Sequence, residues 1–125
     1  MELDELSGLV IGAAIRIHTR LGPGLLESVY HQVLYRDLVG QGLYVESKKA
    51  VSFKFEGMYF ENGFVADLVV DRRLVVEVKS VATLMPVFEK QLLTYLRLLD
   101  CRLGLLINFN VALLKDGIKR IVNNF

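Results

Sequence analysis

Two short runs of β-branched residues, separated by three polar residues, constrain the fold of this chain more than any other segment. Leu68–Val70 and Leu74–Val76 have the composition of strands, and Asp71–Arg73 is the only polar break between them. The segment therefore predicts a β-hairpin with a three-residue loop. In such a hairpin Asp67 lies opposite Glu77.

Charged side chains are expected to converge on one face of this hairpin. Directly opposed residues have Cβ atoms about 4.5–5.5 Å apart, so the carboxylates of Asp67 and Glu77 would meet. Lys79 follows Glu77 by two residues and points to the same face, whereas Val76 and Val78 point to the opposite face, into a core.

Two carboxylates at this separation require a neutralising partner, because at about 4 Å and an effective dielectric constant near 20 they repel by roughly 4 kcal/mol. A hard divalent cation such as Mg²⁺, which binds through one or two carboxylates, would supply it. Lys79 could then orient or deprotonate an attacking water, or stabilise charge on a phosphate. The alternative is a cross-strand salt bridge on a solvated surface. The salt-bridge alternative requires a solvated surface. Three valines, Val65, Val69 and Val75, are instead expected to share the acidic face and to keep it out of water.

Five sequence blocks occur in a fixed order along the chain: Gly24–Tyr30 preceded by Leu21-Gly22-Pro23, Ala66-Asp67-Leu68, Glu77-Val78-Lys79, Gln91–Tyr95 and Gly104–Phe109. In these blocks the chain resembles the GxxExxY proteins, a group within the PD-(D/E)XK nuclease superfamily, from about residue 10 to residue 122. The resemblance implies a restriction-endonuclease-like core, in which helices flank a mixed β-sheet. It bears on the fold more than on activity.

The resemblance also implies roles for the matching residues. Asp67 and Glu77 would be metal ligands, with the backbone carbonyl of Val78 as a further ligand, and Lys79 would be the catalytic lysine. Glu27 would be the helix carboxylate that completes the metal site. The metal would be Mg²⁺ or Mn²⁺.

Gln91 and Tyr95 resemble a QxxxY element that lies near the site and the DNA in recombination nucleases. Their i, i+4 spacing puts both on one face of a helix. Simpler explanations stay open for these residues and for Glu27. The glutamine and tyrosine suit the polar rim of an amphipathic helix, and a glutamate in the first turn of a helix is favoured by the helix dipole by about 0.3–1 kcal/mol.

The rest of the chain is predicted to complete a single domain over residues 1–125, an α/β (α+β mixed) fold with the order α-α-β-β-β-α-β-β. Hydrophobic periodicity predicts helices from about 3 to 21, 25 to 39 and 86 to 99. Strands are expected at 44–55, at 58–60 and 64–70 across a break at Asn62-Gly63, at 74–79 and at 103–108, with a last strand pair around Asp116-Gly117.

The charge of the chain sets limits on its partners. A net charge of +1 provides no global basic field, which counts against a strong sequence-independent binder of nucleic acid. Residues 48–125 hold twelve basic and eight acidic side chains, so this half is expected to face phosphate, with candidates Lys48, Lys49, Lys54, Lys90 and Arg97. The chain has no apolar stretch of 18 residues and an acidic start, which favour a cytoplasmic protein without membrane contact.

Three functions therefore remain open. The first is a Mg²⁺- or Mn²⁺-dependent phosphodiesterase that hydrolyses nucleic acid through Glu27, Asp67, Glu77 and Lys79, with DNA expected as the substrate ahead of RNA. The second is a non-catalytic nucleic-acid-binding module with the same fold. The third is a protein-interaction domain in which the charged groups are paired and silent. An edge strand at either end of the sheet would allow a homodimer.

Overall fold

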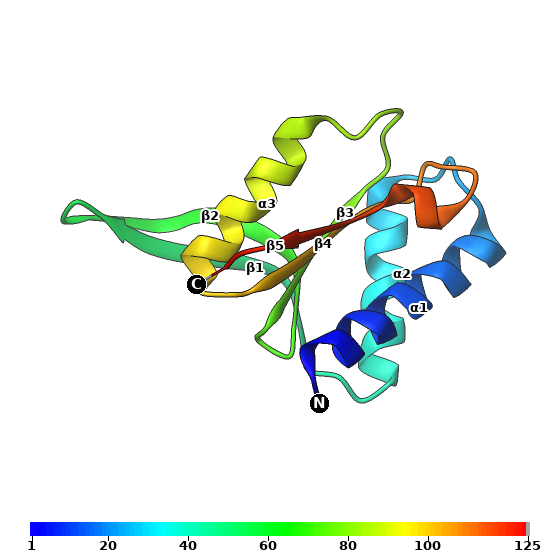
Figure 1. Cartoon of the computed structure of the whole chain (residues 1–125), viewed down its shortest axis with the longest axis horizontal. Coiled ribbons are helices and arrows are strands. Elements are labelled where there is room, and N and C mark those ends of the chain that lie inside the picture. Colours follow the sequence, from blue (N-terminus) through cyan, green and yellow to red (C-terminus); the bar gives the residue numbers. More distant parts are fainter. Residues whose placement is uncertain (125) are drawn as a thin grey trace.

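The computed structural model describes residues 1–124 and shows a five-stranded mixed sheet between two layers of helices (Figure 1). Helices α1 (Leu3–Leu21) and α2 (Glu27–Gly40) lie on one side of the sheet, and α3 (Pro86–Leu99) lies on the other side. In residues 1–124 no helix combines the length and the hydropathy needed to cross a membrane.

The sheet has the spatial order β1-β2-β3-β4-β5, so β1 and β5 are its edges. Strands β3 and β4 are parallel, and all other neighbours are antiparallel. The strands are β1 (Val45–Phe55), β2 (Met58–Val70), β3 (Leu74–Lys79), β4 (Leu103–Asn108) and β5 (Ile118–Val122). The predicted order of helices and strands is confirmed.

Two details of the predicted elements were wrong. Strand β2 is continuous across Asn62-Gly63, because the chain accommodates these residues as an irregularity in the β1–β2 register. The backbone amide of Asn62 bonds the Ser52 hydroxyl there, at 3.0 Å. Around Asp116-Gly117 the chain forms a short 3₁₀ helix, η1 (Leu114–Gly117), followed by the single strand β5, where a strand pair was predicted.

Hydrophobic residues form one cluster on each face of the sheet. The larger cluster joins α1 and α2 to the sheet through side chains that include Tyr30, Val76 and Leu105, and the smaller cluster joins α3 to it. Residues 103–108 are all buried, as predicted for a central strand covered on both faces. Cys101, the only cysteine of the chain, is buried in the smaller cluster.

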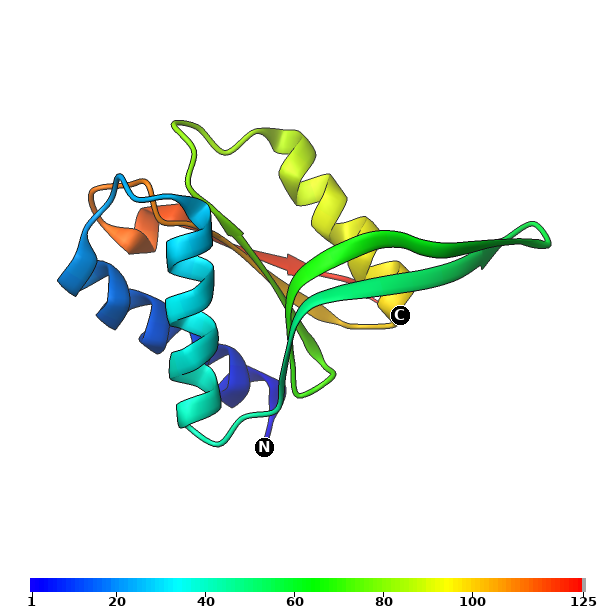
Figure 2. The same ribbon diagram turned by 180° about the vertical axis from the view of Figure 1, so that it is seen from behind.

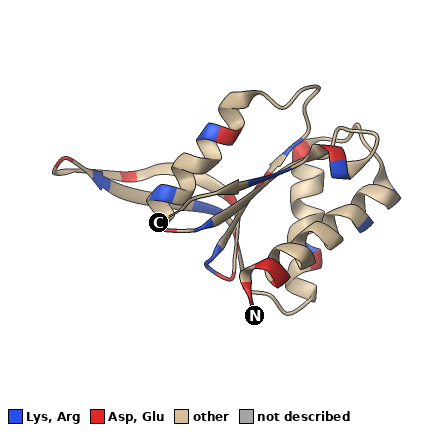
Figure 3. Ribbon diagram, viewed as in Figure 1, with Lys and Arg blue, Asp and Glu red and all other residues tan. Residues whose placement is uncertain are grey.

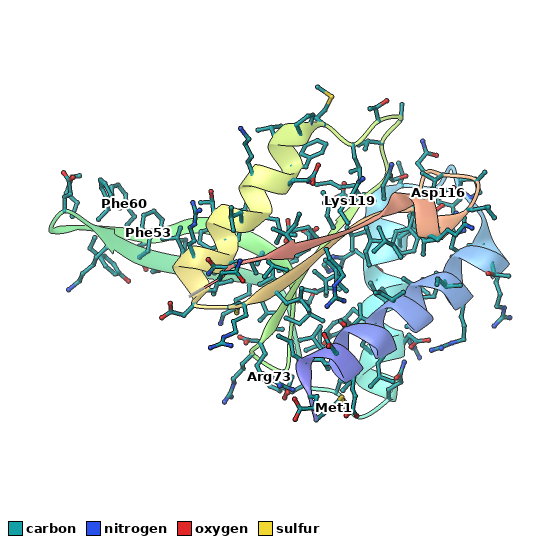
Figure 4. The ribbon with its side chains drawn as sticks, viewed as in Figure 1. Met1, Phe53, Phe60, Arg73, Asp116 and Lys119 are labelled. Carbon is teal, nitrogen blue, oxygen red and sulfur yellow. The ribbon has the colours of Figure 1, made fainter. Side chains whose placement is uncertain are left out.

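Strands β1 and β2 extend beyond the rest of the sheet as a two-stranded ribbon, residues 49–66 (Figure 2). Only Leu68, Val69 and Val70 of β2 pair with β3, so the remainder of β2 pairs with β1 alone. Near the tip, the rings of Phe53 and Phe60 stack with centroids 5.3 Å apart (Figure 4).

The strand face that β2 presents to α3 changes at Asp67. Phe64 and Ala66 pack with the α3 cluster, but Leu68, which regular alternation would put on the same face, packs with the α1–α2 cluster. The expectation that Val65 shares a buried face with Val69 and Val75 was therefore wrong. Val65 is 47% exposed, and Ala66 occupies the buried position.

Candidate functional site

The hairpin that was predicted from the sequence forms with the predicted register. Val70 pairs with Leu74 and Leu68 pairs with Val76, and residues 71–73 form the turn. This register brings Asp67 of β2 next to Glu77 of β3, immediately beyond the last pair of the ladder.

The two carboxylates hold the strands together where the regular ladder ends. The backbone N–H of Asp67 donates to Glu77 Oε2, and the backbone N–H of Val78 donates to Asp67 Oδ2, both at 2.8 Å. Each carboxylate thus accepts a hydrogen bond from the backbone of the opposite strand. We call this junction, where β2 leaves β3 to enter the ribbon, the fork; it consists of Asp67, Glu77, Val78 and Lys79.

Glu77 is the most perturbed ionisable group of the fork. Its side chain is buried, and burial followed by the negative charge of Asp67 raises its pKa to about 8. Lys79 and the hydrogen bond from Asp67 oppose this shift. The fork therefore disfavours two adjacent negative charges and holds a proton near neutral pH.

Lys79 and the first turn of α3 lie together. The Lys79 Nζ is 4.6 Å from the centroid of the Phe88 ring, a distance at which an ammonium group is attracted by the ring face. Tyr95, one of the two residues predicted near the substrate, stacks on Phe64 with centroids 4.2 Å apart. Its pKa is raised by burial and then by the charges of Glu77 and Asp67. Gln91, one turn earlier, is exposed.

Glu27 is the first residue of α2 and is half-buried. Its charge raises the pKa of Glu77, as the smallest of the named causes. Within residues 1–124 no three His, Cys, Asp or Glu side chains lie close enough together to form a metal-binding group. In this structure Glu27 thus stands near the two strand carboxylates without joining them in a three-residue set.

Strand β1 adds a second lysine to the fork. Lys48 Nζ lies 3.7 Å from Asp67 Oδ1, and its side chain is 59% exposed. From the sequence, Lys48 was predicted only as one member of a basic surface. A count from the Glu56-Gly57 turn would put residue 65 opposite it, and only the register shift between Val51 and Phe53 brings Asp67 there.

A buried asparagine organises the loop that follows β3. Asn108, at the end of β4, accepts hydrogen bonds from the backbone N–H groups of Val81 and Asn110 at 3.1 and 3.2 Å, and donates to the Val81 carbonyl at 3.0 Å. Asn108 is also the register partner of Lys79. The signal in the sequence is a lone polar residue at the end of an apolar strand, which must have its hydrogen bonds satisfied when buried.

A groove of about 720 Å³ lies beside α2 and β1, and its lining includes His31, Tyr35 and Ser47. His31 Nε2 and Ser47 Oγ are 2.8 Å apart, and His31 Nδ1 has no hydrogen-bond partner within the described residues. Burial and then the charge of Lys48 lower the pKa of His31, while Asp67 raises it. The groove therefore adjoins the fork from the α2 side.

The geometry agrees with the comparison with known families. A family model of the PD-(D/E)XK nuclease superfamily matches residues 4–121. This chain belongs to the PD-(D/E)XK nuclease superfamily. The matched range contains Asp67 and the segment Glu77-Val78-Lys79. No curated protein and no solved structure matches the chain.

Proposed function

We propose that this PD-(D/E)XK domain hydrolyses phosphodiester bonds of nucleic acid with the help of a divalent cation, Mg²⁺ or Mn²⁺. The observation that carries the proposal is the fork, where the carboxylates of Asp67 and Glu77 meet at the end of a short ladder in the sheet of a nuclease superfamily member, with Lys79 two residues further along β3. DNA is proposed ahead of RNA, because the element that Gln91 and Tyr95 resemble lies near DNA.

The donor set at the fork fits a hard cation. Asp67 and Glu77 each use one oxygen for a backbone N–H, which leaves the second oxygen of each for another ligand. Burial and then the charge of Asp67 raise the pKa of Glu77, and a cation at the fork would favour the charged carboxylate. The Val78 carbonyl would add a neutral oxygen, and Glu27 is the proposed fourth ligand. When bound, the ion would favour hydroxide formation from a bound water and stabilise charge on the phosphate.

The chain's own residues divide the remaining work. Glu77 has to release its proton before it can hold a cation, so cation binding at neutral pH should release protons. Lys79, whose Nζ lies over the Phe88 ring, would contact a phosphate oxygen or the attacking water. Tyr95 on α3, which stacks on Phe64 of β2, is the proposed contact to the substrate beside the fork.

A cleavage assay tests this function directly. Wild-type protein, Asp67→Asn and Glu77→Gln are incubated with linear duplex DNA, single-stranded DNA and RNA, in Mg²⁺ and separately in Mn²⁺. We expect the wild type to cut at least one substrate and both variants to lose activity by at least about a hundredfold, because each removes a cation ligand.

The matched control is Asp71→Asn, which removes an exposed carboxylate from the same hairpin. Asp71 pairs with Arg73 at 2.7 Å and takes no part in the fork, so this variant should cut like the wild type. Wild-type protein that cuts none of the substrates, or Asp67→Asn with full activity, would contradict the proposal. Circular dichroism spectra establish that each variant is folded.

A non-catalytic binding module is the second candidate. It is favoured by the fact that both carboxylates already have backbone partners, as they would in a purely structural role. This candidate predicts nucleic-acid binding that weakens steeply with salt, with no product in either cation. The same assay, with a binding measurement beside it, separates the two candidates.

The homodimer stays a prediction. Its structural support is that β1 and β5 leave the sheet with an open edge on each side. Light scattering on the eluate of a size-exclusion column measures the molar mass. A mass of one chain at all concentrations would contradict it.

A further inference from the structure

Lys48 has an unusual backbone conformation for its place in the fold. Its φ angle is +52°, in the left-handed region that side chains other than glycine rarely adopt. The other described non-glycine residues with positive φ lie at turns, at a helix end or at the β2 irregularity: Glu56, Asn62, Asp71, Arg72 and Asp100. Lys48 alone among them lies within a strand directly beside the candidate catalytic carboxylates.

The conformation of Lys48 interrupts the β1–β2 pairing at Asp67. The register pairs Ser47 with Leu68 and Lys49 with Ala66, and Lys48 and Asp67 occupy the position between. It is also the point at which β2 changes the face that it presents to α3. The local distortion therefore directs both side chains to the fork.

The ion pair with Asp67 does not account for this strain. The Lys48 side chain is 59% exposed and its Nζ is 3.7 Å from the carboxylate, and exposed pairs of this kind contribute little to stability. Strained residues whose strain is not offset by a stabilising interaction of their own are concentrated at functional sites. The result of the distortion is an accessible ammonium group at the mouth of an acidic fork.

The next residue provides a contrast. Lys49 Nζ lies 2.6 Å from Glu46 Oε2, and both side chains of that pair are about two-thirds buried or more. Its charge is thus already neutralised by a neighbour on the same strand. Lys48, in contrast, shares Asp67 with any cation or phosphate that enters the fork.

We infer that Lys48 binds a backbone phosphate of the nucleic-acid strand that enters the fork. Lys48 on β1 and Lys79 on β3 provide ammonium groups from the two strands that flank β2, the strand that carries Asp67. Because phosphate is anionic, it needs these positive charges to approach two carboxylates. This inference rests on the proposed function and adds to it a contact that fixes the strand on the ribbon side of the fork.

The test is the salt dependence of binding, measured by fluorescence anisotropy with a labelled 20-base-pair duplex in EDTA, so that no cleavage occurs. Removing one phosphate contact should reduce the slope of log K against log [salt] by about one. We expect Lys48→Met to show this reduction and a weaker affinity, by about threefold to tenfold at low salt. Lys48→Arg should retain the wild-type slope, and the matched control Lys49→Met should also retain it.

A second variant separates a phosphate contact from a structural role. Lys48→Gly removes the side chain but suits the left-handed backbone, so its melting temperature should equal or exceed that of the wild type. Its binding should nevertheless be as weak as that of Lys48→Met. A purely structural Lys48 would instead make stability and binding fall together.

The outcomes distinguish failure of this inference from failure of the proposed function. A wild-type slope for Lys48→Met, or an equal reduction for Lys49→Met, overturns the phosphate contact and leaves the nuclease proposal intact. Wild-type protein that shows no salt-dependent binding overturns the contact, and cleavage in the separate assay then decides whether the nuclease proposal survives.

Discussion

The centre of the sheet and the projecting ribbon differ in composition and in what surrounds them: β3 and β4 contain no aromatic residue, whereas the ribbon contains five. Strands β3 and β4 are covered on both faces by helices, whereas the ribbon leaves Phe55 and Tyr59 about 60% exposed. Acidic and basic residues occur along the ribbon as well as on the helices (Figure 3). A two-stranded ribbon is marginally stable alone, so its order depends on the sheet that it leaves.

The contrast explains where the fork lies. Glu77 and Lys79 are fixed by the rigid centre of the sheet, while Asp67 and Lys48 stand at the root of the ribbon. Glu77 and Lys79 thus lie on a strand that pairs with neighbours on both sides, whereas Lys48 lies on an edge strand that pairs with β2 alone. Variants of the two regions should therefore behave differently.

The largest expected effect is in the core. Leu105→Ala removes a fully buried side chain from β4 and should lower the free energy of unfolding by about 2–5 kcal/mol. Phe55→Ala in the ribbon tip should change it by less than about 0.5 kcal/mol, because the ring is 59% exposed. Urea denaturation measures both values. Similar losses at the two sites would break the comparison.

The second effect depends on pH at the fork. The pKa of Glu77 is about 8 in the folded protein, above its ordinary value of 4.5. Between these values the folded state binds more protons than the unfolded state, so the wild type loses stability as pH rises from about 4.5 to 8. Glu77→Gln has no carboxyl group to titrate at this position. Its free energy of unfolding, relative to that of the wild type, should therefore rise by up to about 4 kcal/mol over this pH range.

Denaturation midpoints at pH 5, 6.5 and 8 test this prediction for both proteins without a divalent cation. The difference between Glu77→Gln and the wild type should widen toward pH 8 and shrink on addition of Mn²⁺, which would replace the proton in the wild type only. A difference that is constant with pH would mean that Glu77 is ionised in the fold throughout this range.

The smallest effect concerns the loop that follows Lys79 in the chain. Asn108→Ala leaves the backbone of Val81 without its buried partners and should cost about 1–3 kcal/mol. It should also reduce cleavage, because Lys79 is the register partner of Asn108. The control is Asn110→Ala, since only the backbone of Asn110 bonds Asn108. Equal stability and activity of the two variants would remove Asn108 from the support of the fork.

The sequence predicted the hairpin at the fork because a short loop leaves little freedom of register. With three loop residues between two β-branched runs, Asp67 can meet only Glu77 or a close neighbour. The element order was predictable for a similar reason, since long periodic segments such as residues 86–99 leave few alternatives.

The positions of Lys48 and Val65 could not be predicted from the sequence, because they depend on two irregularities of the ribbon. The register shift beyond Val51 moves Lys48 by two positions relative to a count from the turn. The change of face of β2 at Asp67, opposite the left-handed Lys48, reverses the face expected for Val65. The position of Glu27 depends on the non-repetitive segment before α2. No residue pattern specifies such distortions before the packed structure is known.

The buried thiol of Cys101 can serve as a chemical probe for the separation of α3 from the sheet. Burial and the charge of Asp100 raise the pKa of this thiol, so the native protein offers little reactive thiolate. Modification by a maleimide will therefore be slow until α3 separates from the sheet, and its rate measures that separation. Cys101 is the only cysteine of the chain and is buried. In the folded protein a dye would therefore couple to a cysteine introduced on the exposed ribbon and report on the ribbon.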